Sequence, residues 1–135
     1  MYFPDLTPYQ YGGQEPSPGL VNVGWLSIEQ SFAKGPCSAE FMGELARLAA
    51  SPVNLYRGTH LCEFCPEPSM VLSEGGIPML NPAPGTAGNG EIRVQGEGGV
   101  VYVAPTLVLH YIKAHGYLPP KAFINAVLRA RHTAA

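Results

Sequence analysis

Proline and glycine divide this chain into short elements. The 135 residues include 14 prolines and 16 glycines, which gather in the N-terminal third and in residues 75–99. Proline fixes φ and lacks a backbone donor, and glycine readily adopts turn conformations. We therefore expect a Pro-rich arm at residues 1–20 and a long loop at residues 74–90, with short helices and strands elsewhere.

Short β-branched runs predict the strands of a small sheet. Residues 20–26, 53–56 and 70–72 have this character. The clearest signal is a hairpin, in which residues 91–94 and 100–103 flank a Gly-rich turn.

Three further stretches predict helices. Ser38 is a suitable cap for a helix over residues 39–50. Pro105 suits the first turn of a second helix, which Gly116 would stop, and a third helix starts at Lys121. The order of elements predicts an α+β fold, with a small, mostly antiparallel sheet backed by about three helices. The whole chain is expected to form a single domain.

Composition limits the classes of protein to which this chain can belong. The charged fraction is 13%, roughly half the usual value, and the net charge is −2. This balance gives no electrostatic case for a nucleic-acid partner. The sequence has neither a signal peptide pattern nor an apolar run long enough for a membrane span. Its three cysteines do not resemble a secreted disulfide framework, so a cytoplasmic location is expected.

A Cys-x-x-Cys pair is the strongest functional signal. Cys62 and Cys65 can clamp one metal ion from a single turn, and His60 lies two residues upstream. Zinc takes four nitrogen or sulfur ligands in structural sites, and the fourth is expected from His110 or His115. These two histidines are five positions apart on a predicted helix, which separates them by about 140° around the axis. Only one of them is therefore expected to face the cysteines.

Other interpretations of the cysteines stay open. They can be two reduced, buried thiols, or a redox pair, although Pro66 and Pro68 argue against the helix that follows a thioredoxin-type motif. A catalytic metal centre lacks sequence support, because the zinc deaminase pattern and H-E-x-x-H are both missing. Glu63 and Glu91 would be the candidate bases if they lay near the metal.

Two hypotheses concern charged residues. Arg57 and Glu91 are expected to form a partly buried ion pair between the Cys loop and the hairpin. Residues 55–58, Leu-Tyr-Arg-Gly, also resemble the first motif of arginine-type ADP-ribosyltransferases, and Gln95-x-Glu97 resembles their acidic pair. The middle Ser-Thr-Ser strand of that family is missing here.

Aromatic residues are concentrated in the arm. A low charge content and this cluster predict a surface for self-association or for a protein partner. The alternative is that the rings complete the core of the monomer. The residues concerned are Tyr2, Phe3, Tyr9, Tyr11 and Trp25.

Several motifs together resemble a family of small, uncharacterised bacterial proteins. The resemblance covers nearly the whole chain and implies a single domain with no assigned activity. The motifs are Trp25 after a Val-Asn-Val strand, Arg57-Gly58-x-His60-x-Cys62-Glu63-x-Cys65, Gly88-Asn89-Gly90-Glu91-Ile92-Arg93-Val94, Tyr102-Val103-Ala104-Pro105 and His110-Tyr111-x₃-His115-Gly116-Tyr117-x-Pro119-Pro120.

The sequence as a whole favours a non-catalytic cytosolic binding protein, of an immunity or accessory type, in which the Cys/His loop is a structural metal clip. The competing hypothesis is an enzyme with a metal or thiol centre. The fourth metal position separates the two, because a water ligand there favours catalysis and four protein ligands favour a structural role.

Overall fold

The computed structural model describes residues 2–9, 19–53, 60–65, 69–81, 87–88 and 90–133. Side chains at positions 60–61, 69–71, 79–81, 87–88 and 131–133 are outside this description. The elements are β1 (Leu20–Asn22), α1 (Ala39–Ala49), β2 (His60–Leu61), β3 (Ser69–Leu72), β4 (Pro78–Asn81), β5 (Ala87–Gly88), β6 (Glu91–Gln95), the 3₁₀ turn η1 (Glu97–Gly99), β7 (Val101–Pro105), α2 (Val108–His115) and α3 (Lys121–Thr133).

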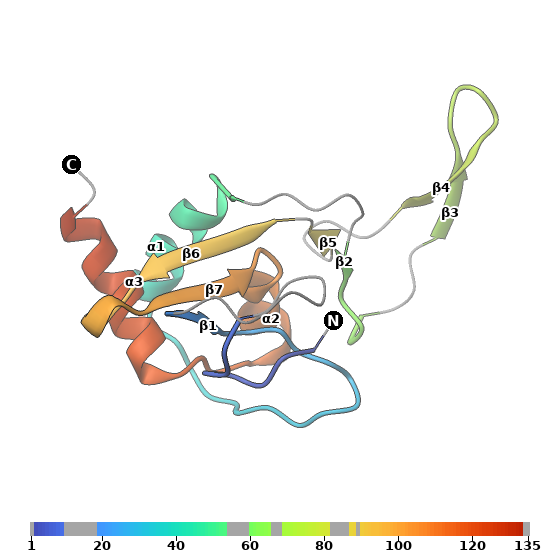
Figure 1. Cartoon of the computed structure of the whole chain (residues 1–135). Helices are drawn as coiled ribbons and strands as arrows, with labels where there is room; N and C mark the ends of the chain where they lie inside the picture. Colours follow the sequence, from blue (N-terminus) through green and yellow to red (C-terminus); the bar gives the residue numbers. More distant parts are fainter. Residues whose placement is uncertain are drawn as a thin grey trace.

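The central sheet has the strand order β1-β7-β6 (Figure 1). β1 runs parallel to β7, and β6 pairs antiparallel with β7 so that Arg93 lies opposite Val103. Two smaller antiparallel pairs, β2-β5 and β3-β4, complete the described strands. Three of the four pairings are thus antiparallel and three α-helices accompany the sheet, which confirms the predicted α+β fold.

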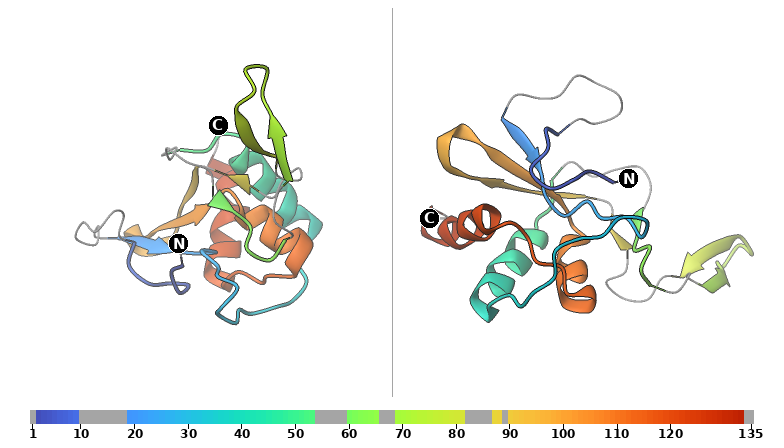
Figure 2. Two further views of the ribbon diagram at one scale, coloured as in Figure 1. Left: turned by 90° about the vertical axis from the view of Figure 1, so that its right-hand side faces the viewer. Right: turned by 90° about the horizontal axis from the view of Figure 1, so that it is seen from below.

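The helices cover one face of the central sheet (Figure 2). Ile92 and Val94 of β6 point into a core that all three helices share. Burying side chains of this size contributes about 1.5–3 kcal/mol each. The largest helical contributions come from Phe41, Leu45, Val108, Tyr111, Phe123 and Val127.

The N-terminal arm covers the opposite face. Tyr9 and Trp25 pack with Val103 of β7 in a second buried cluster, and the Trp25 indole donates to the Val103 carbonyl at 2.9 Å. The arm also pairs with the outer edge of β1, because the amide of Tyr9 donates to Leu20 and the amide of Asn22 donates to Thr7. The sheet is therefore a middle layer between the helices and the arm.

Local sequence signals set most helix boundaries. The Ser38 hydroxyl accepts from the amide of Phe41 at 3.1 Å, which confirms the predicted cap of α1. Gly116 ends α2 in the left-handed conformation at φ 71°, as expected. Pro105 was expected to open that helix, but it ends β7 instead. It lies beyond Val103, the last β7 residue paired with β1, so its missing amide breaks no hydrogen bond between these strands.

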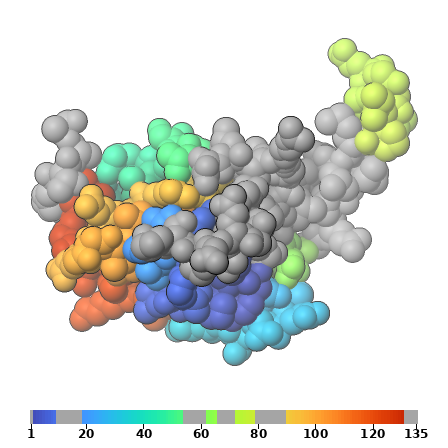
Figure 3. Space-filling view, viewed as in Figure 1, coloured from blue at the N-terminus to red at the C-terminus, as the bar shows by residue number. Residues whose placement is uncertain are grey.

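The structure differs from the long loop that the sequence predicts at residues 74–90. It contains β4 and β5, and β4 pairs with β3 in a hairpin that projects from the body of the molecule (Figures 1 and 3). Pro78 is the first residue of β4, a position where proline is tolerated. The turn is held by the Ser73 hydroxyl, which accepts from the amide of Ile77 at 3.1 Å.

Two predicted strands are shorter than expected. β1 stops at Asn22, and Gly24 takes a left-handed conformation at φ 79°. Val53 forms an isolated bridge to Glu91, and the rest of the predicted strand at 54–56 lies outside the described residues. Within the described part of the chain, no helix is both long enough and apolar enough to cross a membrane.

Candidate metal centre

Four side chains converge on one point beside α2. They are Cys62, Cys65, His110 and His115, and their ligand atoms all lie within 4.8 Å of one another. The Cys65 sulfur lies 3.2 Å from Nε2 of His110 and 3.4 Å from Nε2 of His115. The Cys62 sulfur lies 3.4 Å from the same His115 nitrogen. Two thiols and two imidazoles thus face a common centre.

Local structure places the two cysteines side by side. β2 ends one residue before Cys62, and the chain then makes a turn in which the amide of Cys65 approaches the Cys62 carbonyl at 3.5 Å. This turn brings both sulfurs to one side of the loop, as the C-x-x-C spacing predicts.

α2 supplies both histidines, which corrects the expectation that only one would face the cysteines. His110 lies in the first half of the helix and His115 is its last residue. Helical side chains lean toward the N-terminus, so the His115 ring reaches back toward the level of His110. The ring centroids are 5.0 Å apart at an interplanar angle of 82°. The length of the imidazole and this lean overcome the angular separation around the axis.

The separations suit a tetrahedral ion. Zinc–sulfur bonds of about 2.3 Å and zinc–nitrogen bonds of about 2.0–2.1 Å place sulfur and nitrogen about 3.6 Å apart in a tetrahedron. The three sulfur–nitrogen distances, 3.2, 3.4 and 3.4 Å, are close to this value. The Cys₂His₂ group is therefore at metal-binding distance and suggests a metal ion.

Burial controls the charge of these groups. Burial raises the pKa of Cys62, while backbone amides of Phe64 and Cys65 act in the opposite direction by donating toward its sulfur. Burial and the neighbouring His115 both lower the pKa of His110, which favours its neutral ring. A neutral imidazole is the form that binds metal, and a cation among the sulfurs would stabilise their thiolates.

Phe64 anchors the Cys turn in the core. Its ring lies 5.4 Å from that of Phe32 and 6.0 Å from that of Tyr111, measured between centroids. It also contacts the His115 ring at 5.2 Å. The neighbouring Glu63 is directed elsewhere, because its carboxylate accepts from the amide of Ile28 at 2.9 Å. The ring contacts of Phe64 thus connect the Cys turn to the core.

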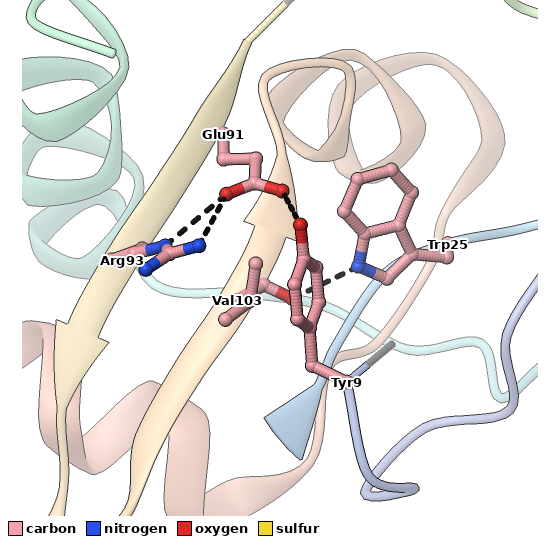
Figure 4. Close-up of polar contacts among 5 residues, drawn as sticks. All are labelled: Tyr9, Trp25, Glu91, Arg93 and Val103. Atoms are coloured by element: carbon pink, nitrogen blue, oxygen red, sulfur yellow. Dashed lines mark hydrogen bonds and ion pairs between the residues drawn. The ribbon is translucent and has the colours of Figure 1, made fainter. Parts of the chain in front are cut away.

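The other candidate base, Glu91, belongs to a different site (Figure 4). It is completely buried, its carboxylate forms an ion pair with Arg93 at 3.1 Å, and it accepts a hydrogen bond from the Tyr9 hydroxyl. Sequence reasoning did not identify Arg93, although opposite charges two positions apart on one strand lie on the same face. Arg57, the expected partner of Glu91, lies outside the described residues.

The aromatic residues of the arm divide into two groups. Tyr9 and Trp25 are only 4% and 3% exposed. These two rings were expected on a partner surface, but they belong to the core of the monomer. Phe3 is partly buried against Trp25 with its centroid at 5.7 Å, and Tyr2 is 38% exposed. Tyr11 lies outside the described residues.

Three remaining candidates lie apart from the cluster or outside the description. The backbone of His60 pairs with Gly88 in the β2-β5 ladder, and its side chain is not among those described. Glu97 is exposed in η1 and forms an ion pair with Arg129 at 2.8 Å. The motif at 55–58 that resembles ADP-ribosyltransferases also falls outside the description.

Comparison with known proteins places the chain in a family. A family model described as a domain of unknown function, DUF7919, matches residues 1–128. The chain matches no curated protein and no solved structure. The family match is consistent with the resemblance to proteins without assigned activity, and it covers nearly all of the 135 residues. The chain therefore belongs to the DUF7919 family.

Proposed function

We propose that this protein is a zinc-stabilised, non-catalytic binding domain. The observation that carries the proposal is the convergence of four protein ligands, Cys62, Cys65, His110 and His115, on one point. Structural zinc sites are closed by four protein ligands, whereas catalytic zinc sites keep one position for water or substrate. A closed centre leaves no reactive position, so its role is to hold the fold.

The donor set supports zinc over other ions. Two thiolates and two imidazoles are soft and borderline ligands, which suit zinc and do not suit magnesium or calcium. When bound, the zinc would link the turn after β2 to α2, two segments separated by 45 to 53 residues. Reduced cysteines of this kind fit the reducing cytosol.

The binding role follows from what the centre supports. Cys65 precedes the β3-β4 hairpin by only four residues, so the centre is close in sequence to the element that projects from the body (Figure 1). The hairpin exposes Leu72 and Ile77, which are 73% and 65% exposed. A chain with few charges that holds apolar residues in solvent is suited to contact a protein. A homodimer and a heterologous partner both satisfy this role.

Metal analysis of the purified protein tests the proposal. We expect about one zinc per chain, and less than a tenth of that after Cys65→Ser or His115→Gln, because three ligands bind structural zinc far less tightly. Cys37→Ser and Lys113→Gln are matched controls. Cys37 is a free thiol outside the cluster and Lys113 lies on α2 between the two histidines. A metal-free protein whose stability is unchanged by zinc would contradict the proposal.

X-ray absorption at the zinc edge separates structural from catalytic centres. The proposal predicts two sulfurs at about 2.3 Å and two nitrogens at about 2.0–2.1 Å. Outer-shell scattering from one imidazole ring, in place of two, would instead support the competing hypothesis of a metal-dependent enzyme.

A further inference from the structure

β6 has an outer edge that the described residues pair with only in part. At its first residue the amide and carbonyl of Glu91 both bond to Val53, at 2.8 and 2.9 Å. Glu91 therefore directs its backbone groups away from β7. Because this direction repeats every second residue in an antiparallel ladder, Arg93 and Gln95 direct theirs to the same outer side. No residue in the described ranges bonds these outward groups.

A groove runs along this free part of the edge. It has a volume of about 430 Å³ and lies between residues 93–96 and two helices. Leu48 of α1 and Ala130 of α3 form its apolar wall. Its size falls within the range of about 300–1,000 Å³ that is usual for ligand sites. The groove can therefore accept an extended segment that continues the sheet beyond Val53.

The charge of the groove selects its occupant. Arg93 and Arg129 are among the described residues that line it, and none of those described is acidic. Each guanidinium already holds one carboxylate, Glu91 and Glu97 respectively, and the side chains remain 34% and 48% exposed. A carboxylate on the helix side of the incoming segment would meet the Arg129 guanidinium, a donor suited to it.

We propose that the outer edge of β6 binds an extended, carboxylate-bearing peptide segment of a partner protein by strand addition. The backbone of the segment would bond the outward groups of Arg93 and Gln95, while a carboxylate on the helix side of the added strand would contact Arg129. A small apolar residue two positions away would lie on the same side and face Leu48 and Ala130. The inference rests on the proposed binding function, and it uses no residue of the metal cluster.

The test uses the full-length protein with its zinc content measured. A displayed library of random short peptides is selected against it, and enriched peptides are titrated into ¹⁵N-labelled protein. We expect enriched sequences rich in Asp or Glu, and the largest amide shifts at Arg93 and Gln95. Free and amidated C-termini are compared in each peptide, to separate a terminal carboxylate from an acidic side chain. N-methylation of alternate peptide amides should abolish binding, because strand addition depends on backbone donors.

Arg129→Gln is the decisive variant. Removing the charge-assisted hydrogen bond between Arg129 and the peptide carboxylate should lower peptide affinity by about tenfold or more. Arg47→Gln is the matched control, since Arg47 is 47% exposed, pairs with Glu44 on α1 and does not line the groove. Equal affinities of the two variants would overturn the inference. So would a selection that yields no peptide, or peptides that shift only the β3-β4 hairpin. In each of these cases an intact zinc content leaves the metal proposal standing.

Discussion

The buried contact between Tyr9 and Glu91 links the arm to the far edge strand of the sheet, and Tyr9→Phe tests what it contributes. The Tyr9 hydroxyl donates to a carboxylate that is completely buried, and Tyr9 itself is 4% exposed. The substitution removes one oxygen and keeps the ring, which packs on Val103 and lies 5.5 Å from the Arg93 guanidinium. The measured change therefore reports the hydrogen bond rather than the packing.

The expected loss follows from the charge of the acceptor. Hydrogen bonds to charged groups contribute about 1.5–3 kcal/mol, and the carboxylate loses a donor that water cannot readily replace. For 135 residues, an unfolding entropy of about 2.1 cal/mol/K per residue corresponds to about 0.28 kcal/mol/K. Tyr9→Phe is therefore expected to lower the free energy of unfolding by about 1.5–3 kcal/mol and Tm by roughly 5–10 °C.

Urea denaturation followed by tryptophan fluorescence measures this change, because Trp25 is the single tryptophan and lies in the same cluster. Tyr2→Phe is the control, since Tyr2 is 38% exposed and its substitution should change stability by no more than about 0.5 kcal/mol. A double-mutant cycle with Glu91→Gln should show a coupling of about 0.5–3 kcal/mol. Equal stabilities of Tyr9→Phe and Tyr2→Phe would refute the reasoning.

Three further predictions concern two glycines and the buried tyrosines. Gly24→Ala should destabilise the protein by about 2–4 kcal/mol in chemical denaturation, because it combines left-handed strain with overpacking: φ is 79° and an added Cβ would lie 2.7 Å from Cγ2 of Val108. Gly43→Ala, in the exposed middle of α1 with open space around it, should instead stabilise by about 0.5–1 kcal/mol. Burial and Asp5 raise the pKa of Tyr117, whose hydroxyl donates to Asp5 at 2.7 Å, and burial also raises the pKa of Tyr111. The unfolded chain loses its tyrosine protons above a pKa of about 10, whereas the folded protein keeps them to higher pH, so the stabilisation is complete only below that value. The free energy of unfolding should therefore fall as pH rises above about 10. Tyr117→Phe should make this fall less steep. A tyrosine absorbance titration in which all seven tyrosines ionise together in the folded protein would contradict this.

Local chemistry explains what the sequence could predict. The cap at Ser38, the stop at Gly116 and the hairpin of β6 and β7 each depend on a few neighbouring residues, so short patterns identify them. The cysteine turn is local in the same sense. The histidines are not, because 45 to 53 residues separate them from the sulfurs. Both imidazoles reach the sulfurs because His115 is the last residue of α2 and its side chain leans toward the N-terminus of the helix. The angular spacing of the two histidines around the axis does not describe this.

Contacts between segments far apart in the sequence could not be predicted from local patterns. β1 lies parallel to β7, and Tyr9 reaches Glu91 across 82 positions. The aromatic arm could equally have covered a partner, since its composition is the same in either case. Its position is determined by the buried carboxylate of Glu91, which attracts a donor, and by the Val103 carbonyl, which accepts from Trp25. Polar groups on the sheet, rather than the hydrophobicity of the arm, therefore select which face the arm covers.

The two edges of the central sheet are covered to different extents, and this difference bears on the proposed binding role. Exposed edges invite unwanted pairing, so proteins cover or guard them. Residues 7–9 cover the edge of β1, and among the residues that the structure describes Val53 covers only the start of β6. The remainder of β6 carries a guanidinium at Arg93 and faces a second one at Arg129. In the proposed binding role, the Arg129 guanidinium would meet a carboxylate on the helix side of the incoming strand, and the outward backbone groups of Arg93 and Gln95 would pair with its backbone.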